Sequence, residues 1–86
     1  MPGNCLITKI KEDLHSVYGE IAEFLVKKRM DDLGLRNKET VTFDEVEEVI
    51  DLLWKRTFPL TIGSERGLEK VRLYMRWLNN ERAAQA

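Results

Sequence analysis

Histidine and cysteine, the side chains that most often carry catalytic or metal chemistry, occur once each in this chain of 86 residues. His15 has no second imidazole with which to bind a metal or to form an acid–base pair. Nothing in the sequence requires His15 to lie close to Cys5 and activate its thiol. The chain also has no second cysteine for an intramolecular disulfide. The glycines of the segment GSERG, Gly63 and Gly67, lack the lysine pattern of a phosphate-binding loop. We therefore expect no enzymatic activity, no metal and no cofactor, and we infer no small-molecule substrate.

Carboxylates form a dense group in the middle of the chain. This acidic cluster consists of Asp44, Glu45, Glu47, Glu48 and Asp51. Acidic side chains are favoured near a helix N-terminus, so the pattern favours a solvated outer helix face. The alternative is a site for a hard cation or for a basic partner.

The segment TVTFDEVEEVI, which contains Glu45, resembles the end of an EF-hand calcium loop running into its second helix. With Glu45 as the last ligand of such a loop, Arg36 and Lys38 would stand at ligand positions. Neither side chain can coordinate calcium. The resemblance therefore implies a turn at most, and no calcium site.

Composition narrows the class of protein. Hydrophobic residues make up 43% and charged residues 34% of the chain, which is typical of a soluble globular domain. The net charge of −1 argues against a dedicated nucleic-acid binder, which usually carries a positive excess. No apolar run approaches the roughly 18 residues of a membrane span, and the N-terminus lacks the pattern of a secretory signal. We expect a single cytoplasmic domain over residues 1–86 that does not contact a membrane.

The elements that position these side chains are all predicted to be helices, forming a small three-helix bundle over 5–33, 43–57 and 64–80, with a frayed tail over 81–86. The first helix is predicted from apolar residues that recur every three or four positions. They are Ile7, Ile10, Leu14, Val17, Ile21 and Phe24. Gly34 suits the left-handed position that ends a helix, with Leu35 folding back on Met30 in a Schellman motif.

The second helix has a clear start. Thr42 and Glu45 have the spacing of a capping box, and Val41 and Val46 that of a hydrophobic staple. We expect this helix to end near Thr57, because Pro59 lacks an amide hydrogen and disfavours helical dihedrals at the preceding Phe58. The third helix begins after Ser64, a suitable N-cap.

The third helix carries the segment RLYMRWL, which has two apolar faces. The predicted core face contains Leu68, Val71, Tyr74, Met75 and Leu78. Gly67 lies at its margin, where the missing side chain would let another helix approach closely.

Leu73 and Trp77 fall on the opposite face of this helix, beside Arg66 and Lys70. In one interpretation Trp77 folds over the first helix and completes the core. In the other, which we favour, Leu73 and Trp77 are the anchors of a protein interface and Arg66 and Lys70 are its rim.

The predicted helix lengths suggest a homodimer. A first helix of about 28 residues would extend roughly 42 Å, against roughly 24 and 26 Å for the other two. Either the long helix bends near Gly19, or a second copy or another partner covers its overhang; both remain open.

The expected function is that of a small regulatory, adaptor or accessory protein which binds another protein or itself. The alternative is a dimeric DNA-binding regulator, in which the last two helices form a helix-turn-helix-like unit. Its DNA-contacting residues would be Arg66, Lys70, Arg72 and Arg76. The preceding helix is net negative, which would place carboxylates close to the phosphates.

Overall fold

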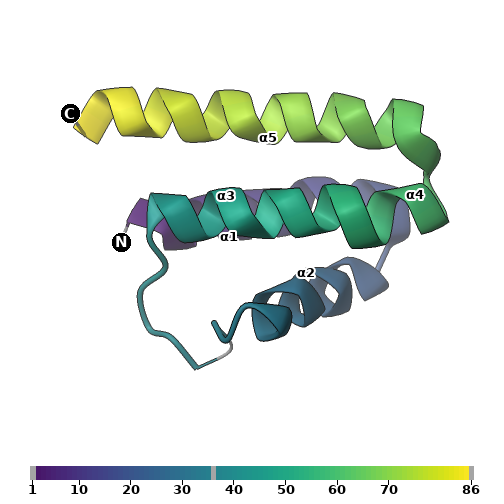
Figure 1. The fold of residues 1–86 in the computed structure, drawn as a ribbon, viewed down its shortest axis with the longest axis horizontal. Helices are drawn as coiled ribbons and strands as arrows, with labels where there is room; N and C mark the ends of the chain where they lie inside the picture. Colours follow the sequence, from purple (N-terminus) through teal and green to yellow (C-terminus); the bar gives the residue numbers. More distant parts are fainter. Residues whose placement is uncertain (1, 36, 86) are drawn as a thin grey trace.

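The computed structural model describes residues 2–35 and 37–85, and in these ranges every regular element is a helix, as the sequence predicts (Figure 1). The elements are α1 (Pro2–Tyr18), α2 (Ile21–Asp32), α3 (Phe43–Leu52), a π-helix η1 (Leu53–Thr57), α4 (Phe58–Thr61) and α5 (Gly63–Gln85). Because α3, η1 and α4 follow one another without a break, the described chain forms four helical rods instead of the predicted three. None of these helices is long and apolar enough to cross a membrane.

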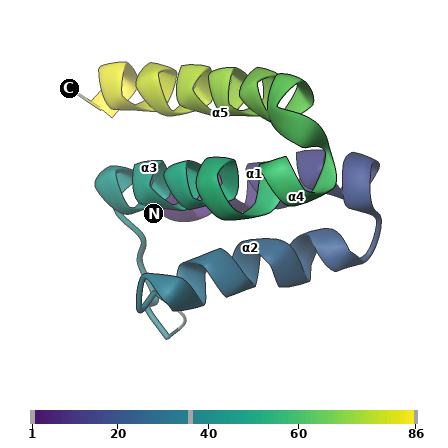
Figure 2. The ribbon, with the colours of Figure 1, turned by 45° about the vertical axis from the view of Figure 1, so that its right-hand side comes forward.

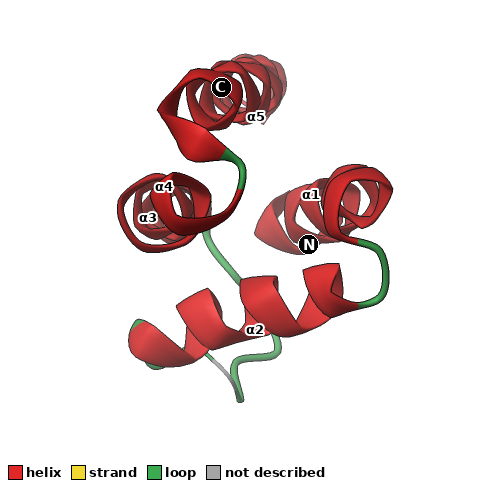
Figure 3. Ribbon diagram, turned by 90° about the vertical axis from the view of Figure 1, so that its right-hand side faces the viewer, coloured by secondary structure: helices red, strands yellow, loops and turns green. Residues whose placement is uncertain are grey.

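The rods pack around one apolar core. In the end-on view of Figure 3, α1 and α3 lie beside each other, α5 lies across the top of both, and α2 crosses beneath them. The start of α1 and the end of α5 lie at the same end of the molecule (Figure 2). The buried apolar side chains are Leu6, Ile7, Ile10, Leu14, Ala22, Val26, Leu35, Val41, Val46, Val49, Ile50, Leu53, Phe58, Tyr74 and Leu78.

The prediction of one helix over 5–33 is wrong, because the chain turns at Gly19. Gly19 has a φ of +70°, which ends α1, and its carbonyl accepts a bond from the amide of Ala22 at 3.1 Å. After the turn, α2 buries Ala22 and Val26 and leaves Ile21 and Phe24 exposed. The predicted apolar stripe therefore ends with α1, and the overhang that suggested a dimer disappears.

Two local predictions at helix ends are confirmed. At the end of α2, the amide of Leu35 bonds to the carbonyl of Met30 at 2.9 Å, and that of Gly34 to Asp31 at 3.0 Å, the two bonds of a Schellman motif. At the start of α3, Thr42 and Glu45 form both bonds of the capping box, at 2.9 and 3.1 Å.

The predicted end of the second helix near Thr57 is also wrong. Phe58 keeps helical dihedrals, and its amide bonds to the carbonyl of Leu53, five residues back. This wider turn takes up the chain just before Pro59, which has no amide to donate, so the rod continues to Thr61. Phe58 is then fully buried against α5.

The third predicted helix is longer than expected at both ends. It begins at Gly63, and the tail predicted to fray is helical through Gln85; Ala86 lies outside the described residues, as does Arg36. Gly67 is buried, and a Cβ at this position would lie 2.6 Å from the Cβ of Phe58. This confirms that the glycine permits a close helix approach.

Candidate protein-binding surfaces

The predicted interface anchors lie against α1. The Trp77 ring packs on Tyr74 with its centroid 5.3 Å away, and the Nζ of Lys9 lies over the Trp77 ring at 4.5 Å. Leu73 is likewise partly buried against the core. This placement matches the interpretation in which Trp77 completes the core, although both side chains stay partly exposed.

A polar network continues this contact between α1 and α5. Asp13 on α1 accepts hydrogen bonds from the Nζ of Lys70 at 2.9 Å and from the hydroxyl of Tyr74 at 2.6 Å. Burial, and then the bond to Asp13, raise the pKa of Tyr74 far above its usual range. Lys70, predicted as part of the rim, thus has its charge neutralised within the fold.

The remaining cations of the predicted basic face point to solvent. Arg66, Arg72 and Arg76 are exposed, and none of them forms an ion pair within residues 2–35 and 37–85. However, α3 and α5 lie side by side (Figures 1 and 2), whereas the helices of a helix-turn-helix unit cross at about 90–120°. The basic quartet is therefore divided between the α1 contact, which holds Lys70, and the outer face of α5.

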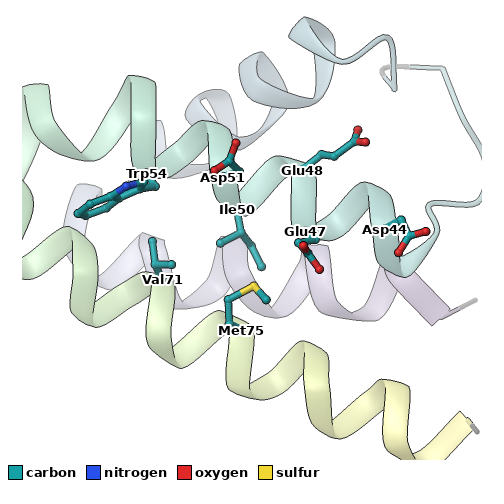
Figure 4. A pocket seen from close by; sticks show the side chains of 8 residues that line it. All are labelled: Asp44, Glu47, Glu48, Ile50, Asp51, Trp54, Val71 and Met75. Atoms are coloured by element: carbon teal, nitrogen blue, oxygen red, sulfur yellow. The ribbon is translucent and has the colours of Figure 1, made fainter.

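An open groove lies between α5 and the rod formed by α3 and η1 (Figure 4). Its volume is about 510 Å³. We call it the acidic groove. Its apolar floor consists of Ile50, Trp54, Val71 and Met75, and its rim of Asp44, Glu47, Glu48 and Asp51.

The rim carboxylates differ in their partners. Arg82 donates to Glu47 at 2.8 Å and to Asp44 at 2.7 Å, bridging α5 to α3 at one end of the groove. Asp51 pairs with Lys55, one turn later, at 2.9 Å. Glu48 is exposed and makes no ion pair in the described parts of the chain.

The sequence pattern identifies the acidic cluster and the apolar residues of this groove, but it does not show that they lie next to each other. The acidic cluster is predicted as an outer face with a basic partner as the alternative, and Val71 and Met75 are predicted as core. In the structure Val71 and Met75 are only partly buried, because α5 lies over both α1 and α3 and its α3 side stays open. Periodicity gives the faces of a helix but not how deeply each face is covered.

A second hollow lies on α2. It measures about 460 Å³ and is lined by Lys11, Phe24, Lys27, Lys28, Met30, Asp31 and Asn37. Phe24 is 62% exposed, more than any other aromatic residue in the described parts of the chain. Lys27 pairs with Glu23 at 3.1 Å, and this pair lowers the pKa of Glu23. The hollow thus has a mixed rim with fewer carboxylates than the acidic groove.

None of the residues in 2–35 and 37–85 forms a group of three or more histidine, cysteine, aspartate or glutamate side chains placed to hold a metal ion.

Comparison with protein-family models, with curated proteins and with solved structures finds no match to this chain.

Proposed function

We propose that this chain is a small non-enzymatic protein-interaction module, a regulatory, adaptor or accessory subunit, which receives its partner protein in the acidic groove. The supporting observation is the groove itself: Trp54 of η1 and Val71 and Met75 of α5 stay partly exposed beside a polar rim on α3. An apolar centre with a polar rim is the usual anatomy of a protein interface. The third predicted helix stays the proposed binding helix, but through Val71 and Met75 in place of Leu73 and Trp77.

Two further predictions belong to this proposal and stay untested. One is a cytoplasmic location. The other is self-association: a second copy is the competing occupant of the groove, now that the turn at Gly19 removes the overhang that suggested a dimer.

Affinity capture from nuclease-treated lysate tests the proposal, with three baits. The wild type is compared with Met75→Glu, which charges the floor of the groove, and with Phe24→Glu, which makes the same change on exposed α2 surface. Circular dichroism first establishes that all three baits fold. We expect a protein, identified by mass spectrometry, that the wild type and Phe24→Glu retain and that Met75→Glu loses at least tenfold, about 1.4 kcal/mol of binding energy.

The captured protein is then purified and titrated against each bait, so that the interaction is measured between two defined components. Equal capture by the wild type and Met75→Glu would contradict the proposal. A loss confined to Phe24→Glu would instead move the binding surface to α2.

A further inference from the structure

The walls of the acidic groove have the spacing of a helix-binding channel. Ile50 and Trp54 stand four residues apart on the rod of α3 and η1, and Val71 and Met75 stand four residues apart on α5. Each pair is therefore one turn apart, about 6 Å along its helix. Figure 4 shows the two pairs facing each other across the groove. A channel between two neighbouring helices fits a third helix whose apolar residues recur every three or four positions.

The charge along this channel has one sign. The four rim residues all come from α3. Glu47, Glu48 and Asp51 follow Asp44 by three, four and seven residues, so the four share one helix face about 10 Å long. None of the residues lining the groove is a cation. Carboxylates therefore line the α3 side of the groove over about two turns.

The protein already shows which group these carboxylates bind. Arg82 reaches across from α5 and donates one charge-assisted hydrogen bond from each terminal nitrogen, to Asp44 and to Glu47. The pair between Asp51 and Lys55 is more than half exposed on both sides, so it is weak and open to exchange. Glu48 is left for a cation from outside.

We propose that the occupant of the acidic groove is a cationic amphipathic helix of a partner protein, an inference that rests on the proposed function. Its apolar residues pack on the partly exposed side chains of Trp54, Val71 and Met75, while its lysines or arginines pair with Glu48 and Asp51. The rim repels nucleic-acid phosphates and acidic peptides. Arg82 occupies the end of the groove near the start of α3, so the helix lies against the part nearer to η1.

A displayed library of helical peptides tests this inference. The library keeps leucine at every third or fourth position and randomises the flanking positions among lysine, glutamate and glutamine. Selection on the wild type is compared with selection on Met75→Glu, and the sequences and net charges of the enriched peptides are read out. We expect enriched peptides with lysine on one flank that bind the wild type and not Met75→Glu.

Charge reversal then tests the rim. The double variant Glu48→Lys/Asp51→Lys is compared with Glu65→Lys/Glu69→Lys, which makes the same change of net charge at exposed positions on α5. We expect the groove variant to bind a selected peptide about tenfold more weakly and the α5 variant to change the affinity less than twofold. In a Trp77→Phe background, the emission of Trp54 alone reports whether the peptide lies in the groove.

The outcomes separate the two proposals. Peptides that need the groove but carry no excess of lysine, or that ignore the charge reversal, overturn the cationic helix and leave the interaction module in place. Peptides that bind Met75→Glu as well as the wild type overturn both. Self-association of the wild type in sedimentation, abolished by Met75→Glu, would show that a second copy covers the groove and would also overturn the inference.

Discussion

At the scale of single residues, the hydroxyl of Tyr74 combines burial with a hydrogen bond to a carboxylate. It is buried, it donates to Asp13 at 2.6 Å, and its pKa is raised. The unfolded phenol ionises near pH 10, whereas the folded one keeps its proton. Above about pH 10 the unfolded state thus binds fewer protons, so the free energy of unfolding must fall as the pH rises. Below pH 10 both states are protonated, and this contribution is fully present.

We therefore predict that Tyr74→Phe is less stable than the wild type at pH 7, by about 1–2 kcal/mol, because it loses a hydrogen bond to a carboxylate. The variant should also lose less stability between pH 9 and about pH 11.5 than the wild type does. Urea unfolding at a series of pH values measures both effects. Tyr18→Phe is the control, since Tyr18 bonds to Thr61 at 2.5 Å and stays half-buried. Equal alkaline losses in Tyr74→Phe and the wild type would contradict the assignment.

At the scale of elements, the fold depends on the turn between α1 and α2. Gly19 has a φ of +70°, and a Cβ at this position would meet no atom within 4 Å. A substitution there thus changes the backbone energy without a steric clash. We predict that Gly19→Ala lowers the free energy of unfolding by about 1–2 kcal/mol, because alanine is strained in the left-handed region.

Gly19→Asn is the matched control for this prediction. Asparagine adopts positive φ more readily than alanine, so it should recover part of the loss. Thermal unfolding followed by circular dichroism measures both variants. An alanine variant as stable as the wild type would mean that the chain prefers the continuous helix over 5–33 that the periodicity predicts.

The elements also show why some boundaries could be predicted and others could not. The start of α3 and the end of α2 have short-range signals that act within a few residues, and both were predicted. Gly19 allows a bend but does not decide for one, because apolar residues recur at helical spacing on both sides of it. The choice between a bend and a straight helix was decided by tertiary packing, which buries Ala22 and Val26 in place of Ile21 and Phe24.

Pro59 gave a clear local signal that the fold overrides. A proline interrupts an α-helix, but the π-turn of η1 carries the chain past it without a break. Burial of Phe58 against Gly67 of α5 favours this continuation. Trp54, near the start of this wide turn, lines the acidic groove.

At the scale of the whole molecule, the prediction of a partner-binding face on α5 depended on how many helices pack against α5. The sequence shows two apolar faces on this helix, and we favoured an interface for the face with Trp77. In the structure α5 lies over two helices, so the face with Trp77 packs on α1 and the face with Met75 lies beside α3. Two apolar faces on one helix therefore indicate two helix neighbours as readily as a binding partner.

The distribution of charge over the molecule bears on the DNA-binding alternative. The net charge is −1, and the carboxylates of α3 lie alongside the helix that carries Arg66, Arg72 and Arg76. The phosphates of a duplex docked on α5 would be attracted by these three arginines and repelled by the carboxylates of the acidic groove. We predict only weak binding to duplex DNA, with no dependence on base sequence and a steep loss between 50 and 200 mM salt.

Fluorescence anisotropy with labelled duplexes of different sequence measures this, using the wild type, Arg72→Gln/Arg76→Gln and Glu48→Gln/Asp51→Gln. The arginine variant should abolish the residual binding, and the groove variant should strengthen it slightly, because each change alters the local charge by two. The cationic peptide should respond in the opposite sense to the groove variant. Tight binding that distinguishes one base sequence from another would contradict the prediction and favour the DNA-binding regulator over the interaction module.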